Sequence, residues 1–177
     1  HADIFGSLDD IKRQFHHLVR TIPGNGLILS PTGDTHIEDM LHAGCWTPRQ
    51  QFGIGVDEET CKKLASGGEV FWNAIQTTPD GGEFEVVKYG GGQDGNGVSR
   101  NTVRWGQTGK HNVSNGLAAI AAAHHAGVEV ATACAALGEF LGVKRRLELL
   151  GEIAGVSVYD DFAHHPTAIA TTLEGMQ

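Results

Sequence analysis

The chain has 177 residues, of which 40% are hydrophobic and 19% are charged, and it contains 25 glycines but only 5 prolines. This composition excludes wholesale disorder, and the length suits one domain or one domain with part of a second. A formal net charge of -8 excludes a general binder of polyanions, because proteins that follow a phosphate backbone need basic stripes. A single small anionic ligand is compatible with this charge, and we expect no nucleic-acid partner.

Cysteine content and hydropathy indicate a cytoplasmic protein. Its three cysteines, Cys45, Cys61 and Cys134, are far apart in the sequence and form no Cys-x-x-Cys pair. This argues against a disulfide framework and against a structural zinc site. We expect these cysteines and Trp46 to lie in the core. No stretch approaches about 18 consecutive apolar residues, so neither a membrane-spanning helix nor a membrane partner is expected.

The first part of the chain alternates between helices and strands. Apolar side chains recur at helical spacing from Ser7 to Ile22, and Pro23-Gly24 ends this helix. A short buried strand is expected at 27–29, followed by a second helix that opens at 31–34 and runs to about His42. Such alternation of strands and helices predicts an α/β fold.

After Trp46 the pattern changes to strands separated by glycine-rich turns. The expected strands are Phe52–Val56, Val70–Thr77, Phe84–Lys88 and Val98–Trp105. The glycine-rich run at 90–97 lies between two of them, whereas a dinucleotide-binding motif follows a strand and opens a helix, so we interpret this run as a surface connection. Gly109-Lys110 is followed by His111 rather than by Ser or Thr, and we therefore find no phosphate-binding loop in the chain.

The last part of the chain returns to helices and then changes pattern again. Two alanine-rich helices are expected at 112–125 and 129–141. Beyond Gly142-Val143 we expect a hairpin of strands at 147–153 and 156–159, and a helix that opens at Pro166, a favoured first helical position. We interpret this change as a domain junction, with residues 1–142 in one domain and 143–177 in the next.

The residues that open the first alanine-rich helix are candidates for ligand binding. The start of a helix presents free N–H groups and a positive dipole end. His111 and Asn115 are four residues apart and share a helix face, and an asparagine amide offers the paired donor and acceptor that an adenine edge requires. Ordinary capping by Asn112, with a solvated Asn115, explains the same residues equally well.

A second candidate region surrounds the hairpin. The strand at 156–159 delivers Asp160, Asp161, His164 and His165 to its carboxyl end, where open α/β sheets bind ligands. Helix capping by aspartate with two surface histidines is the alternative interpretation, and the cluster lacks the spacing of known zinc motifs. Likewise, Arg145-Arg146 is either a solvated pair or a clamp for a phosphate or ribose.

A resemblance to a known family rests on four stretches, which are 1–5, 109–120, 142–148 and 159–167. The last of these reads Tyr-Asp-Asp-Phe-Ala-His-His-Pro-Thr. Together they resemble the Mur ligase family, ATP-dependent enzymes that join amino acids or peptides to the carboxylate of a UDP-sugar. The resemblance implies that 1–142 are the C-terminal part of a central ATPase domain and that 143–177 begin a Rossmann-like, peptide-binding C-terminal domain.

The reaction that the resemblance implies is amide-bond formation. Magnesium-bound ATP phosphorylates the lactyl carboxylate of UDP-N-acetylmuramate, the amine of the incoming peptide attacks the acyl phosphate, and phosphate leaves. Such chemistry depends on positioning and charge neutralisation, and we assign no catalytic residue within the chain. Details at 1–5, 14–20, 44–46 and 163–169 favour members that transfer the tripeptide L-Ala-γ-D-Glu-meso-diaminopimelate over members that transfer L-alanine.

The resemblance also implies roles for single residues. Contacts with the nucleotide are implied for His111, Asn112, Asn115, Arg146 and Asp161. The first three would contact the adenine and neighbouring groups, the arginine would reach the nucleotide from the C-terminal domain, and the aspartate would hold the ribose or order the closed state. His1 would be a magnesium ligand. His164 and His165 would lie near the incoming peptide.

The chain departs from the family pattern in several respects. The UDP-sugar domain, the Gly-Lys-Thr phosphate loop and the metal-binding glutamate of the family would precede residue 1, and the C-terminal domain would break off inside its first helix. Lys110 stands where related ligases often carry an acidic residue. We therefore expect an internal fragment, inactive by itself and of undetermined oligomeric state. The alternative from another class is a non-catalytic module in which His164 and His165 capture a metal or small anion.

Overall fold

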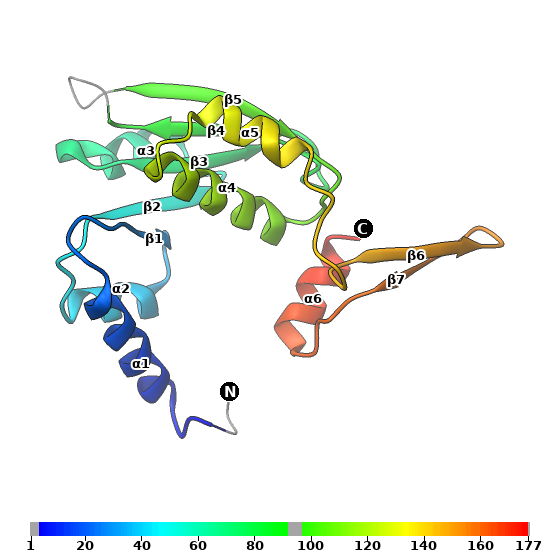
Figure 1. The fold of residues 1–177 in the computed structure, drawn as a ribbon, viewed down its shortest axis with the longest axis horizontal. Helices are drawn as coiled ribbons and strands as arrows, with labels where there is room; N and C mark the ends of the chain where they lie inside the picture. Colours follow the sequence, from blue (N-terminus) through cyan, green and yellow to red (C-terminus); the bar gives the residue numbers. More distant parts are fainter. Residues whose placement is uncertain (1–3, 92–96, 177) are drawn as a thin grey trace. The chain divides into compact units, whose positions relative to one another are not determined.

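The computed structural model describes residues 4–91 and 97–176 (Figure 1). It has the mixed α/β architecture predicted from the sequence, with a sheet in the order β1-β2-β3-β4-β5 and a separate hairpin of β6 and β7. The strands of the sheet are β1 (Ile28–Pro31), β2 (Arg49–Ile54), β3 (Phe71–Gln76), β4 (Glu83–Tyr89) and β5 (Val98–Arg104). The chain forms two compact units, with α1 to α3 in the first and α4 to α6 in the second.

In the first unit, helix α1 (Leu8–Thr21) follows the expected boundaries closely because its ends are encoded locally. The hydroxyl of Ser7 accepts from the backbone N–H of Asp10, and the next helix, α2 (Thr35–His42), is capped in the same way by Asp34. The two helices pack against each other, and β1 pairs with β2 in parallel from Ile28↔Arg49 to Pro31↔Phe52. The predicted strand–helix alternation is confirmed here.

A further helix of the first unit was absent from the sequence-based prediction. Helix α3 (Glu58–Leu64) occupies part of a stretch in which we expected only strands and turns. Its seven residues are too few for apolar periodicity to stand out. The capping signals are nevertheless present, because the side chain of Asp57 accepts from the backbone N–H of Thr60 and acidic residues fill the first turn.

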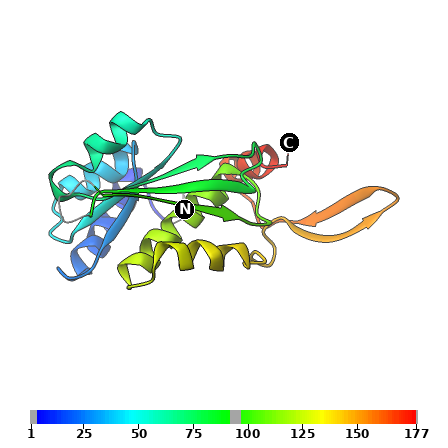
Figure 2. The ribbon, with the colours of Figure 1, turned by 90° about the horizontal axis from the view of Figure 1, so that it is seen from above.

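The second unit contains the helices α4 (Lys110–His125) and α5 (Val130–Gly138), which pack on each other. Figures 1 and 2 show both helices on the same side of strands β4 and β5. The buried face of α4 consists of Val113, Gly116, Leu117, Ile120 and Ala121. The expected alanine-rich helices are thus confirmed, with α4 beginning two residues before the predicted start.

The predicted hairpin and final helix are also present in the second unit. Strands β6 (Glu148–Ile153) and β7 (Val156–Asp160) pair in antiparallel fashion with an irregularity between Leu149 and Gly151. Helix α6 (Pro166–Glu174) follows, with Pro166 in its first turn. In the described parts of the chain, none of the helices has the length and apolarity that a membrane span requires.

The expected burial of the cysteines and of Trp46 is only partly correct. Cys61 and Cys134 are buried, and Cys45 is partly exposed. The prediction for Trp46 is wrong, because 57% of this residue is accessible to solvent. Trp46 lies in the loop between α2 and β2, where no strand or helix directs its side chain inwards. Burial raises the pKa of the Cys134 thiol to about 11, so this thiol stays protonated at neutral pH.

Candidate functional site

The start of α4 is tied by its backbone to the turn between β3 and β4. Gly109 precedes the helix with φ of 90°, and its N–H donates to the carbonyl oxygen of Asp80 over 2.7 Å. A Cβ at Gly109 would lie 2.8 Å from the ring of His111. Glycine is therefore required here for its left-handed backbone and for space. No side-chain hydrogen bond caps this helix, and within its first turn the N–H of Asn112 donates to the carbonyl oxygen of Gly109 over 3.0 Å.

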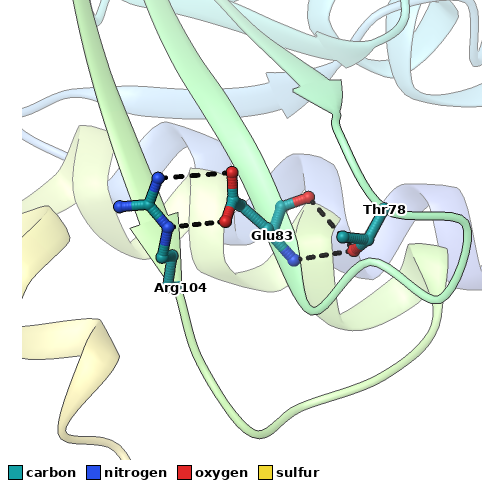
Figure 3. Close-up of polar contacts among 3 residues, drawn as sticks. All are labelled: Thr78, Glu83 and Arg104. Atoms are coloured by element: carbon teal, nitrogen blue, oxygen red, sulfur yellow. Dashed lines mark hydrogen bonds and ion pairs between the residues drawn. The ribbon is translucent and has the colours of Figure 1, made fainter.

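The turn between β3 and β4 is held by the contacts shown in Figure 3. The N–H of Glu83 donates to Oγ1 of Thr78 over 2.9 Å, and the guanidinium of Arg104 binds the Glu83 carboxylate with Nε–Oε2 2.5 Å and Nη2–Oε1 3.4 Å. Within the turn, the hydroxyl of Thr78 and the N–H of Gly82 hold the pKa of the Asp80 carboxyl below its usual value. Asp80 therefore carries a negative charge at neutral pH.

The residues between α5 and β6 form a tight corner, Arg145–Leu147, which we call the arginine corner. Arg145 has φ of 61° and Leu147 has φ of 50°, both in the left-handed region that residues with a Cβ avoid. Each such residue costs about 1–3 kcal/mol and persists only where surrounding contacts impose it. The N–H of Leu147 donates to Oδ2 of Asp161 over 2.9 Å, and the N–H of Arg145 donates to Oε2 of Glu148 over 2.8 Å.

These two regions line one cavity of about 890 Å³, which we call the first cavity. Its lining includes Asp80 from the β3–β4 turn, Asn112 from α4, and Arg146, Leu147 and Tyr159. Its volume falls within the range of about 300–1,000 Å³ that is typical of small-molecule sites. An amide, a guanidinium and an aromatic ring around one space suit a flat polar heterocycle that carries negative charge.

A second cavity of about 690 Å³ is also lined by residues at the start of α4. Its lining includes Thr78, Asp80, Lys110, His111 and Glu174. Asp80 lines both cavities, so the β3–β4 turn contributes to each of them. His111 and Asn112 are neighbours in the sequence, but consecutive residues of a helix do not face each other. Asn112 therefore lines the first cavity and His111 lines the second.

The predicted site residues at the start of α4 are therefore not all together. Asn112 lines the first cavity, and its Nδ2 donates to the carbonyl oxygen of Thr108 over 2.7 Å. This bond leaves the amide oxygen and the second N–H for other partners. His111 lines the second cavity, and Asn115 is exposed and lines neither of the two. The alternative interpretation of Asn115 as a solvated residue matches its position.

The carboxylate of Asp161 accepts hydrogen bonds from backbone N–H groups. Besides the bond from Leu147, its Oδ1 accepts from the N–H of Ala163 over 2.7 Å, so both carboxylate oxygens are engaged. His164 contacts the carbonyl oxygen of Phe162 through Nδ1 at 2.9 Å, and its ring lies 4.5 Å from that of His165. Neither histidine lines the two cavities.

Two expectations concern residues beyond the described ones. His1, the implied magnesium ligand, and most of the glycine-rich run at 90–97 lie outside them. Among residues 4–91 and 97–176, no three His, Cys, Asp or Glu side chains are grouped in a way that could hold a metal ion.

Asp80 and Tyr159 line the first cavity but were not among the site residues predicted from the sequence. Asp80 is part of the run Pro79-Asp80-Gly81-Gly82, a turn signal that explains its presence without a ligand. Tyr159 is the penultimate residue of the largely exposed strand β7, and only the tertiary structure places it in the lining of the first cavity. Neither residue carries a spacing signal that could have identified it.

Comparison with known proteins finds two domain families in the sequence. Residues 1–123 match the Mur ligase middle domain, and residues 145–177 match the Mur ligase, glutamate ligase domain. The UDP-N-acetylmuramate–L-alanyl-gamma-D-glutamyl-meso-2,6-diaminoheptandioate ligase of Haemophilus influenzae is 45% identical over 177 residues, which are 100% of this chain and 34% of that protein. The UDP-N-acetylmuramate–L-alanine ligase of Caldicellulosiruptor bescii is 34% identical over 173 residues, which are 98% of this chain and 34% of that protein.

A solved structure agrees with these matches. The crystal structure of a murein peptide ligase from Psychrobacter arcticus has a TM-score of 0.70 and 44% identity, over 97% of this chain and 32% of that chain. The chain thus spans about a third of the length of the curated relatives that it matches.

Proposed function

This chain belongs to the Mur ligase family, and we propose that it serves the ATP-dependent joining of L-alanyl-γ-D-glutamyl-meso-diaminopimelate to UDP-N-acetylmuramate. The product is an amide bond to the lactyl carboxylate of the sugar. We further propose a cytoplasmic location and a boundary between the central and C-terminal domains after residue 142. This proposal is supported by the two family matches, of which the first ends at residue 123 and the second begins at residue 145.

The observation that carries the proposal is that Asn112 and Arg146 line one cavity. They come from the two motifs with implied nucleotide contacts, one at the start of α4 and one between α5 and β6. A nucleotide between them would explain why an amide and a guanidinium converge on the same space. The identity of 45% to the Haemophilus influenzae ligase across the whole chain supports the tripeptide as the substrate, against 34% to the L-alanine ligase.

The residues of the first cavity fit a purine nucleotide by their chemistry. Asn112 offers a carbonyl oxygen and an N–H to a base edge, and Tyr159 offers an aromatic face for packing. Arg146 offers a fork of N–H donors to a phosphate or to ribose hydroxyls. ATP, when bound with Mg²⁺, supplies the phosphoryl group that activates the carboxylate. We propose Asp161 as a residue that orders the corner, and His111 as a neighbour of the nucleotide through the second cavity.

The chemistry assigned to this chain is positioning rather than covalent catalysis. Burial is the main cause that raises the thiol pKa of both Cys61 and Cys134. Neither thiol is therefore a ready nucleophile at neutral pH. Holding the nucleotide in a fixed orientation, with its charge compensated by Arg146, is the kind of contribution that phosphoryl transfer requires. For His164 and His165 we propose contact with the incoming peptide.

The test is a chimera in which this chain replaces the matching segment of the Haemophilus influenzae ligase. We expect phosphate release that depends on ATP, UDP-N-acetylmuramate and the tripeptide, at a rate near that of the parent enzyme. The 177 residues without the rest of the chimera should release no phosphate, because they contain no phosphate-binding loop. L-Alanine in place of the tripeptide is the discriminating substrate.

Activity with L-alanine and none with the tripeptide would favour the L-alanine ligase alternative. Stoichiometric zinc in the purified chain, together with an inactive but folded chimera, would favour the metal-binding module built on His164 and His165. The described residues speak against that module, because no third ligand accompanies the two histidines.

A further inference from the structure

The arginine corner holds two neighbouring arginines in different surroundings. The guanidinium of Arg145 lies 3.3 Å from the Asp160 carboxylate, measured from Nε to Oδ2, and 5.2 Å from the centre of the Phe162 ring. Arg146 instead lines the first cavity, and within residues 4–91 and 97–176 it has no carboxylate partner. Because Asp160 balances the charge of Arg145, the positive charge offered to the cavity comes from Arg146 and from Lys144, which also lines it.

The backbone of the corner is held in an unfavourable conformation by several contacts at once. Arg145 and Leu147 both have positive φ, and Arg146 lies between them. The N–H groups of Arg145 and Leu147 donate to the carboxylates of Glu148 and Asp161, and the N–H of Phe162 donates to the carbonyl oxygen of Arg145 over 2.9 Å. Strained residues that persist through this much support are concentrated at active sites and ligand clamps.

We infer that Arg145 is a positioning residue of the nucleotide site. Its side chain bridges to Asp160 and Phe162 and thereby fixes the arginine corner, so that Arg146 faces the first cavity; Arg145 itself does not contact the nucleotide. This inference rests on the proposed function, in which Arg146 binds ATP. The two adjacent arginines thus have different roles: Arg145 positions the corner, and Arg146 binds the nucleotide.

The pair of tasks is tested by a double-mutant cycle on the 177-residue chain. ATP is titrated into ¹⁵N-labelled protein, and the dissociation constant is read from NMR shifts, which measure weak binding. Arg146→Ala should weaken ATP binding about tenfold, as expected for the loss of a charge-assisted hydrogen bond. Arg145→Ala should weaken it about fivefold, and in the Arg146→Ala background it should have no further effect.

Two other variants separate positioning from general stability. Arg145→Lys keeps the charge opposite Asp160 and should recover part of the affinity, whereas Arg145→Ala should not. The matched control is Arg100→Ala, which removes an exposed arginine that forms an ion pair with Glu85 at 2.6 Å and lines neither cavity. It should leave the dissociation constant unchanged. Shifts in the free protein should show Arg145→Ala disturbing residues 146 and 147.

The outcomes separate the inference from the function on which it rests. If the wild-type chain does not bind ATP, or if Arg146→Ala binds it normally, the proposed nucleotide site is wrong and the inference falls with it. If Arg146→Ala weakens binding but Arg145→Ala does not, only the positioning role is wrong. The positioning role is also wrong if Arg145→Ala weakens ATP binding as much in the Arg146→Ala background as it does alone. Such a result would indicate direct contact of Arg145 with ATP or general destabilisation.

Discussion

Gly109 and Gly175 meet backbone against backbone: a Cβ placed on Gly175 would lie 3.1 Å from Cα of Gly109. The first glycine precedes α4 and the second follows α6, so this contact holds the end of the last helix against the start of the helix that carries His111 and Asn112. Gly175 lines both cavities and Gly109 lines the second. The absence of a side chain at both positions therefore allows the end of α6 to approach the start of α4 this closely.

Gly109→Ala should destabilise the protein more than Gly127→Ala does. Both glycines have positive φ, at 90° and 94°, so each alanine meets the same backbone strain of about 1–2 kcal/mol. A Cβ at Gly109 also approaches the His111 ring to 2.8 Å, whereas nothing lies within 4 Å of a Cβ at Gly127. Urea unfolding of both variants measures the difference. Equal losses of stability would mean that the contact with His111 imposes no constraint.

Asp161→Asn should loosen the arginine corner. The carboxylate accepts one N–H on each oxygen, from Leu147 and from Ala163, whereas an amide has only one accepting oxygen. The cost should be about 1–3 kcal/mol, the range for a polar group left without its partner. Amide hydrogen exchange provides a local measurement, and the N–H of Leu147 or of Ala163 should exchange faster. Unchanged exchange at both would show that the carboxylate does not hold the corner.

Stability should fall in alkali between pH 9 and about 11 in part because of Cys134. Burial raises the pKa of this thiol from 9.0 to about 11, so the unfolded chain loses the proton at lower pH than the folded one does. The folded state then binds more protons, and the free energy of unfolding decreases as pH rises through that window. Cys134→Ala should reduce the slope, as measured by urea unfolding at pH 8, 9.5 and 11. Identical slopes would contradict the assignment.

Arg146→Ala and Asn115→Ala distinguish the two kinds of residue implied at the nucleotide site. In the chimera, Arg146→Ala should raise the KM for ATP about tenfold with a smaller change in kcat, as expected when a binding contact is lost. Asn115 is exposed and lines neither cavity, yet the family motif implies contact with the adenine. A raised KM for ATP with Asn115→Ala would support that implied contact, and a normal KM would identify Asn115 as a solvated helix residue.

Helix and hairpin boundaries were predictable because their signals are local. Ser7 caps α1, Pro166 opens α6, and the glycine at 155 follows Ala154 in the turn between β6 and β7. The missed helix α3 follows the same rule with Asp57 as its cap, but its seven residues gave no periodic pattern to draw attention to it. Trp46 was misplaced because the size of an aromatic side chain does not determine which side of a loop it occupies.

From the sequence by itself came the α/β class, most of the secondary structure and the family, because capping residues, apolar spacing and motifs are written within short stretches of chain. Tertiary structure decided that Asn112 and Arg146 share a cavity while His111 lines another, and that Asp161 supports backbone N–H groups. These relations depend on the contact of the end of α6 with the start of α4, and on the first cavity being lined by both α4 and the hairpin. Relations of this kind depend on contacts between residues that are distant in the sequence, so no pattern within a short stretch of chain predicts them.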